Sequence, residues 1–184
     1  GTRIGAPETG PLELAAQGVG DREVIALVPA AGVLTMSADI PIKRGPRLLA
    51  ALPFALEEQL ADDVEHLHFT AGSRRDDGRL PVAVVARHLL EGWLADLADV
   101  GIRPLRVVPE NHGLARIPGT LSALVAEDRV MFNDGDDEEF VLQDVKPSDA
   151  LALAGVLDDK GGAGKDTSQH LLVYCEPSDE QRFE

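Results

Sequence analysis

The stretch LPFALEEQLADDVEHLHF, residues 52–69, decides how the chain around it is interpreted. Apolar residues in and before this stretch repeat every three or four positions, which predicts one stripe along a helix over residues 47–64. They are Leu48, Leu49, Leu52, Leu56, Leu60 and Val64. Pro53 interrupts the stripe. Because a proline removes a backbone donor and crowds the carbonyl four residues earlier, we expect a kink, or a break into two helices, near Leu52.

The polar side of this predicted helix carries four carboxylates. They are Glu57, Glu58, Asp62 and Asp63. An acidic helix face is usually just the hydrated side of the helix. The alternative is a docking surface for a basic partner, because opposite charges steer association.

Two strands are predicted before the helix. Residues 24–28 form a short apolar run ended by Pro29, which is typical of a strand covered on both faces. Residues 33–40 alternate apolar and polar side chains, and we interpret them as its antiparallel partner. Residues 1–20 are rich in glycine and proline, so we expect a loose arm with at most a short apolar piece over residues 12–16.

A hairpin is predicted after the helix. Residues 67–71 and 80–86 have strand patterns, and Asp77 and Gly78 between them favour a tight turn.

A second helix follows the hairpin. Apolar residues at helical spacing predict it over residues 89–100, and Gly101 lies where a left-handed cap residue is expected. Residues 105–108 then form a short apolar strand. This order of elements predicts one mixed α/β sheet with helices on its faces.

The last third of the chain carries weaker signals. Strands are predicted over residues 121–125, 129–132, 140–142 and 170–175. The second and third of these form a hairpin with an acidic tip. Ser148 is predicted to cap a short helix ending at Ala154, and residues 158–168 form a glycine-rich polar loop.

Length and composition limit the possible classes of protein. The chain has 184 residues, 44% of them hydrophobic, which suits one domain or two small lobes. A formal net charge of -15 repels phosphate backbones and anionic head groups, so we expect no nucleic-acid partner. The single cysteine, Cys175, excludes an internal disulfide and a thiolate metal cage. No apolar run is long enough to span a membrane, so we expect a soluble piece.

A glycine-rich segment ending in Lys165 suggests a phosphate-binding loop at first sight. The match fails, because Asp159 stands where a glycine is needed and Asp166 replaces the Ser or Thr that binds magnesium. A flexible polar linker is the better interpretation.

Two further groups of residues have the chemistry of metal ligands. His66 and His68 are two apart and would share one face of a strand, but a hydrolase metal site needs a third ligand. The acidic run around Gly135 lacks the order of a calcium loop. A charged hairpin tip, or a docking surface for a basic partner, explains that run.

The stretch quoted at the start closely resembles the signature of the L component of type II secretion systems, the GspL family. Residues 27–41 are similar to the strand pair that precedes that helix in the family. Residues 101–110 are similar to its later passage from helix to strand. The resemblance covers approximately residues 21–142, and Pro53 is part of the family pattern.

This resemblance implies an α/β fold of the actin-like, ribonuclease-H-like kind, with mixed sheets and flanking helices, related to the PilM proteins of type IV pili. The family's first strand is not evident near the beginning, so we expect partial or truncated lobes. The expected division is a flexible or poorly ordered arm over residues 1–20 and a first lobe over residues 21–109. A second lobe portion, with the acidic hairpin and the glycine-rich loop, is expected over residues 110–184.

The resemblance also implies a function without catalysis, a cofactor or a metal. Members of the family lie at the cytoplasmic side of the bacterial inner membrane and cross it once. They bind the N-terminal domain of the secretion ATPase GspE, pair with GspM through their membrane and periplasmic parts, and form homodimers. The alternative function is that of a nucleotide-binding, PilM-like assembly protein.

Charge alone nominates the residues that would contact the ATPase. They are Glu57, Glu58, Asp62, Asp63, Asp136, Asp137, Glu138 and Glu139. We expect their binding to be sensitive to salt.

Overall fold

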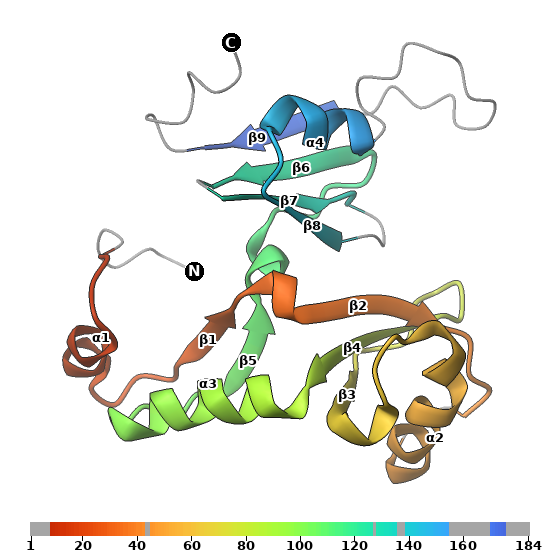
Figure 1. Cartoon of the computed structure of the whole chain (residues 1–184), viewed down its shortest axis with the longest axis horizontal. Coiled ribbons are helices and arrows are strands. Elements are labelled where there is room, and N and C mark those ends of the chain that lie inside the picture. The colour runs from red at the N-terminus through yellow and green to blue at the C-terminus, as the bar shows by residue number, and fades with distance from the viewer. Residues whose placement is uncertain (1–7, 43–44, 127, 136–138, 155–169, 176–184) are drawn as a thin grey trace.

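The computed structural model describes residues 8–42, 45–126, 128–135, 139–154 and 170–175. Its strands form three sheets, and the upper sheet in Figure 1 belongs to a separate lobe from the lower two. The predicted glycine-rich loop and three of the nominated acidic residues, Asp136, Asp137 and Glu138, lie outside the described residues.

One sheet of the first lobe is antiparallel throughout. Its strands are β2 (Val33–Ala38), β3 (Leu67–Ala71) and β4 (Leu80–Ala86), in the order β2-β4-β3. The predicted hairpin of β3 and β4 is confirmed. Every second residue of β4, from Leu80, is buried in the largest core of the molecule, as the pleat of a strand requires.

Helix α2 (Pro46–Leu56) packs on this sheet through Leu52 and Leu56, which are fully buried. Pro53 lies inside the helix and does not divide it, so the expected break near Leu52 is wrong. A proline in a helix costs about 3 kcal/mol. Burying two leucine side chains contributes about 3–6 kcal/mol, which offsets that cost.

The helix also ends earlier than predicted. It stops at Leu56 and gives way to two short 3-10 turns, Glu57–Gln59 and Val64–His66. The four nominated carboxylates of this region therefore lie on turns, not on one helical face. Asp63 caps the second turn, its side chain accepting a hydrogen bond of 3.0 Å from the Glu65 amide.

Strand β1 (Ile25–Val28) pairs in parallel with β5 (Arg106–Pro109) in a sheet of its own. The predicted pairing of residues 24–28 with residues 33–40 is therefore wrong, because a 3-10 turn, Ala30–Gly32, redirects the chain and β2 pairs with β4 instead. The strand is also not covered on both faces. Ile25 is 58% exposed and Leu27 is 60% exposed. The single sheet predicted from the order of elements is thus two sheets.

Helix α3 (Arg87–Asp99) joins β4 to β5 along the lower edge of Figure 1. Its end confirms the predicted glycine cap. Gly101 has φ +80°, its amide donates to the Ala98 carbonyl at 2.9 Å, and the Ile102 amide donates to the Leu97 carbonyl at 2.8 Å. These two bonds form a Schellman motif.

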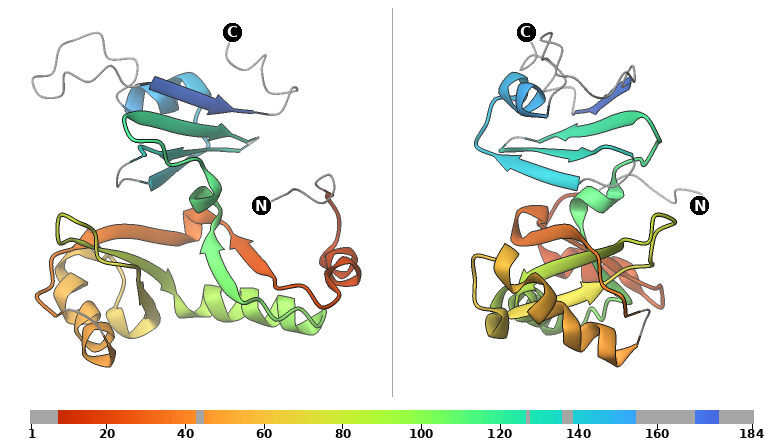
Figure 2. Two further views of the ribbon diagram at one scale, coloured as in Figure 1. Left: turned by 180° about the vertical axis from the view of Figure 1, so that it is seen from behind. Right: turned by 90° about the vertical axis from the view of Figure 1, so that its right-hand side faces the viewer.

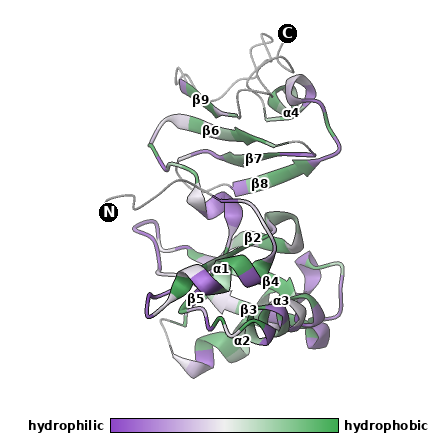
Figure 3. Ribbon diagram, turned by 90° about the vertical axis from the view of Figure 1, so that its left-hand side faces the viewer, coloured by the Kyte–Doolittle hydropathy of each residue, from purple (hydrophilic) through white to green (hydrophobic). Residues whose placement is uncertain are grey.

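The second lobe is a four-stranded sheet in the order β8-β7-β6-β9. Its strands are β6 (Thr120–Val125), β7 (Arg129–Asn133), β8 (Glu139–Gln143) and β9 (His170–Tyr174). The hairpin of β7 and β8 is confirmed, and β9 runs parallel to β6. Figure 3 shows the hydrophobic colouring of these strands.

Helix α4 (Pro147–Leu153) lies against the sheet of this lobe in Figure 2. Its residues Ala150 and Leu151 are buried in the core of the lobe. The predicted cap is wrong. The helix begins with Pro147, whose ring suits the first helical position, and Lys146 precedes it without a side-chain cap. Ser148 lies inside the first turn.

Helix α1 (Leu12–Val19) replaces part of the predicted loose arm. None of its residues is buried, and it lies apart from both lobes in Figure 1. Among the described residues, no helix has both the length and the apolar character needed to cross a membrane.

Candidate functional site

The two lobes meet at the short turn Glu110–Gly113, which leads from β5 toward β6. Glu110 contacts both sides of this junction. Its Oε1 accepts a hydrogen bond of 3.3 Å from the Ala30 amide of the first lobe, and its Oε2 accepts one of 3.1 Å from the Arg129 guanidinium of β7. The hydrogen bond to Glu110 raises the pKa of Arg129 above its usual value.

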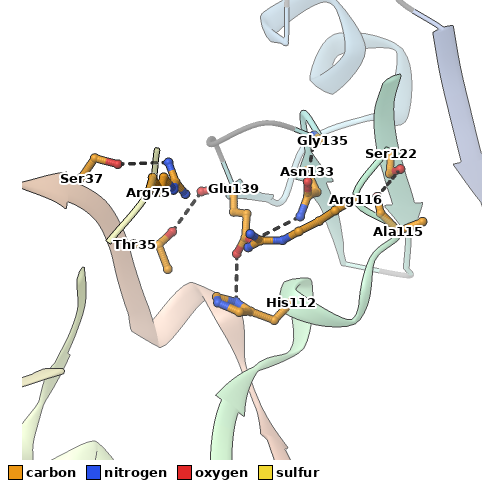
Figure 4. A network of polar contacts seen from close by, with 10 residues as sticks. All are labelled: Thr35, Ser37, Arg75, His112, Ala115, Arg116, Ser122, Asn133, Gly135 and Glu139. Carbon is orange, nitrogen blue, oxygen red and sulfur yellow. Dashed lines mark hydrogen bonds and ion pairs between the residues drawn. The ribbon is translucent and has the colours of Figure 1, made fainter. Parts of the chain in front are cut away.

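A second carboxylate, Glu139, makes a parallel connection at the start of β8 (Figure 4). Its side chain is 4% exposed and forms ion pairs with Arg116 and with His112, whose Nδ1 lies 2.9 Å from Oε2. The Asn133 amide donates to Oε1 at 3.1 Å. The Thr35 hydroxyl of β2 donates to the Glu139 carbonyl at 3.2 Å, which ties this strand to the first lobe.

The surroundings of His112 disfavour its protonated form. Burial lowers its pKa below the ordinary value of 6.5, and the nearby Arg116 guanidinium lowers it further. The approach of Nδ1 to Glu139 lacks hydrogen-bond geometry, and Oε2 has no hydrogen-bond partner among the described residues. The imidazole and the carboxylate are therefore in close contact without a hydrogen bond between them.

The turn that leads into β8 is fixed by sterics as well. Gly135 has φ +81°, and a Cβ at this position would lie 2.0 Å from the Ile117 carbonyl oxygen. The Gly135 amide donates to the Asn133 side chain at 2.9 Å. Only glycine fits here, so this Asp-Gly turn has a structural role at the junction of the lobes.

A groove of about 800 Å³ opens beside this junction. Its floor is the face of the β2-β4-β3 sheet opposite α2, and its walls come from α3 and β5. Residues from both lobes border it: Thr35, His68, Arg75, Trp93, Arg106, His112, Arg116 and Glu139. Figure 4 shows Thr35, Arg75, His112 and Arg116 around Glu139.

The nominated acidic residues that the structure describes lie in two different lobes. Glu57, Glu58, Asp62 and Asp63 are all exposed on the turns after α2, and we call them the acidic turn. Glu139 was nominated with the hairpin tip, but its carboxylate is buried against Arg116 and His112. Its carboxylate is 4% exposed and is paired inside the second lobe, and its backbone carbonyl accepts the hydrogen bond from Thr35 of the first lobe.

The expected placement of His66 and His68 on one strand is wrong. His66 ends a 3-10 turn and His68 lies on β3, so the two do not share a strand face. Within the described ranges, no group of three or more His, Cys, Asp or Glu residues is placed to hold a metal ion.

The groove and the junction escaped the sequence analysis for a physical reason. Their residues come from many elements that are distant in the chain, and no local motif contains them. The available signal was the position of Glu110, His112 and Arg116, three polar residues in the connection that follows an apolar strand. Such residues lie where a connection leaves a sheet, which is a common place for functional groups.

Comparisons with known proteins agree with this arrangement. The family model for type II secretion system protein L matches residues 6–179. Protein L of Dickeya chrysanthemi is 36% identical over 98 residues, which are 53% of this chain and 24% of that protein. Protein L of Pseudomonas aeruginosa is 40% identical over 77 residues, 42% of this chain and 20% of that protein. The chain thus spans about a quarter of the length of these relatives.

A solved structure shares the fold. It is the cytoplasmic domain of EpsL, an inner-membrane component of the type II secretion system of Vibrio cholerae, with a TM-score of 0.72 and 24% identity. The likeness covers 90% of this chain and 66% of that one. That domain has an actin-like fold, so the predicted fold class is confirmed. The family match extends over more of the chain than the stretch that first suggested it, and the chain belongs to the type II secretion system protein L family.

Proposed function

We propose that this chain is the cytoplasmic part of the inner-membrane platform of a type II secretion system and that it anchors the secretion ATPase GspE. The match of the family model to residues 6–179 carries this proposal. The likeness to the EpsL cytoplasmic domain supports it, because that domain belongs to an inner-membrane component of such a system.

The physical character of the molecule suits an anchor. Hydrogen bonds from the Ala30 amide to Glu110 and from the Thr35 hydroxyl to the Glu139 carbonyl connect the first lobe to the second. Within the second lobe and its connecting turn, Glu110 and Glu139 are paired with Arg129 and Arg116. The acidic turn is exposed beside a well-packed helix and is available to a basic partner surface. Interactions between such surfaces guide association and weaken as salt rises.

The partners follow from the same proposal. The N-terminal domain of GspE is the cytoplasmic partner, and a second copy of the chain completes a homodimer. GspM pairs with the membrane and periplasmic parts of the whole protein.

The nucleotide-binding alternative is less well supported by the described residues. Both Asp-Gly turns already have local partners. The Asp77 carboxylate accepts a hydrogen bond of 2.6 Å from the Arg79 side chain, and Gly135 packs against Ile117. Hydrogen bonds from the Arg79 backbone and side chain lower the pKa of Asp77.

Co-purification with the tagged N-terminal domain of GspE from the same organism tests the proposal. We expect a stable complex of the two purified proteins in size-exclusion chromatography. Failure of both well-folded proteins to co-elute at micromolar concentration would reject the anchor function.

Charge reversal then tests the proposed surface. Replacing Glu57, Glu58, Asp62 and Asp63 with lysine should weaken the complex by at least about tenfold. The control reverses Glu91, Asp96 and Asp99, which are exposed on α3. Equal losses in both variants would show that only net charge matters and would remove the acidic turn from the interface.

A further inference from the structure

The two faces of the β2-β4-β3 sheet have different surroundings. Alternation along β4 directs Leu80, Val82 and Val84 into the core under α2, while Pro81, Ala83 and Val85 face the groove, which Val82 also borders. The groove face also carries short polar side chains, among them Thr35 and Thr70. It is therefore a floor of mixed polarity, which suits a peptide with both polar and apolar groups.

One wall of the groove supplies an apolar surface with an aromatic ring. Leu90 and Trp93 of α3 form this wall, and neither side chain is fully buried. A partly exposed tryptophan beside a leucine is a common anchor site for an apolar side chain at protein interfaces.

The charge of the groove is opposite to that of the molecule. The whole chain has 17 Lys and Arg against 32 Asp and Glu. The groove collects three arginines, Arg75, Arg106 and Arg116, and Glu139 is the one carboxylate among its described lining residues. That carboxylate is already paired with Arg116 and His112.

Arg106 is the cation of this set that has no internal partner. Its side chain is exposed at the groove, and within the part of the chain that the structure describes it makes no hydrogen bond or ion pair. Arg75, in contrast, donates to the Ser37 hydroxyl at 3.4 Å and stands beside Thr35 in Figure 4. A guanidinium binds carboxylates well, often with two parallel hydrogen bonds.

We propose that this groove binds an acidic peptide segment of a partner protein. A carboxylate of the peptide pairs with Arg106, and an apolar side chain next to it packs on Leu90 and Trp93. This inference goes beyond the anchoring of the ATPase, because it specifies the ligand chemistry of one surface and holds for any partner that carries such a segment. It also differs from the acidic turn, which would attract basic surfaces.

The chain carries its own reporter for this site, since Trp93 is its one tryptophan. The experiment titrates the protein with a blocked eight-residue peptide of alternating glutamate and leucine and follows tryptophan emission. We expect a saturable change in emission with this peptide. A peptide of alternating lysine and leucine should leave the emission unchanged.

Two variants locate the binding. Arg106→Ala should weaken the affinity about tenfold, the loss expected for a hydrogen-bonded charge pair. Arg47→Ala is the matched control, because Arg47 is exposed on α2 and lies outside the groove. Circular dichroism of both variants verifies that they keep the fold.

Several outcomes would overturn the inference. They are an unchanged emission with the glutamate peptide, an equal response to the lysine peptide, and an affinity that Arg106→Ala does not alter. A saturable response to magnesium ATP that the glutamate peptide fails to displace would assign the groove to a nucleotide instead. Co-elution with GspE does not depend on any of these results, so the two proposals fail separately.

Discussion

At the scale of single residues, the carboxylates of this chain have two distinct roles. Most are exposed and give the surface its charge, whereas Glu110 and Glu139 face arginines at the junction of the lobes. A buried carboxylate is stable only when it is paired and hydrogen-bonded. Glu139 meets this condition through Arg116 and Asn133.

We therefore expect Glu139→Gln to destabilise the protein. Removing the charge leaves the Arg116 guanidinium without its carboxylate, and the loss should be about 1–2 kcal/mol because Arg116 is half exposed. Urea unfolding measures this as a lower midpoint at an unchanged slope. Glu91→Gln, on the exposed side of α3, is the control and should change the stability by less than about 0.5 kcal/mol.

The lowered pKa of His112 makes the stability of the folded protein depend on pH. Its pKa is lowered in the folded protein by burial and by Arg116, so the unfolded chain takes up a proton at a higher pH than the folded one. The free energy of unfolding should fall as the pH drops below about 6.5 and level off below the folded pKa. Denaturation across this range should show a smaller fall for His112→Gln. The same fall in wild type and in that variant, with His88→Gln as control, would contradict the assignment.

At the scale of elements, helix ends and turns determine how the strands are connected. The Schellman motif after α3 directs the chain into β5, and it depends on the left-handed conformation of Gly101. A side chain at this position meets no other atoms, so any cost of a substitution comes from the backbone alone.

Two glycine substitutions in and after α3 should have opposite signs. Gly101→Ala forces a side chain into the left-handed region and should cost about 1–2 kcal/mol. Gly92→Ala, in the interior of the same helix with open space around it, should stabilise the protein by about 1 kcal/mol. Thermal unfolding of the two variants measures the difference, and a gain for Gly101→Ala would refute the cap.

Local patterns explain which elements were predictable. The hairpin of β3 and β4 and the cap of α3 depend on neighbours in the chain, and the sequence identified both. The pairing of β1 with β5 joins residues about 80 positions apart, and no periodicity contains that information. The break into two helices expected at Pro53 is wrong for a similar reason, since the burial of Leu52 and Leu56 against distant strands stabilises one continuous helix.

The candidate site was predictable only in part. The acidic turn is a property of local composition, and its exposure agrees with the prediction, although its helical setting was wrong. The burial of Glu139 depends on Arg116 and His112, which approach it from another element. The charges in the sequence therefore identified candidate contact residues. They did not show which of these carboxylates lie on the surface and which are buried.

At the scale of the whole molecule, the chain consists of two connected lobes with an acidic exterior and a basic groove. Hydrogen bonds of Glu110 to the Ala30 amide and of the Glu139 carbonyl to Thr35 connect the lobes beside the groove. The acidic turn and the groove are thus surfaces of opposite charge on one molecule. Its proposed work is to hold other proteins in place, and salt should weaken that hold.

The most direct measurement is isothermal titration calorimetry of this chain with the purified N-terminal domain of GspE from the same organism. We predict saturable binding of the two proteins at about 50 mM salt. The affinity should weaken as the salt approaches about 300 mM, where the Debye length is shorter. A titration without heat of binding, confirmed by a second method and with both proteins folded, would contradict the central claim.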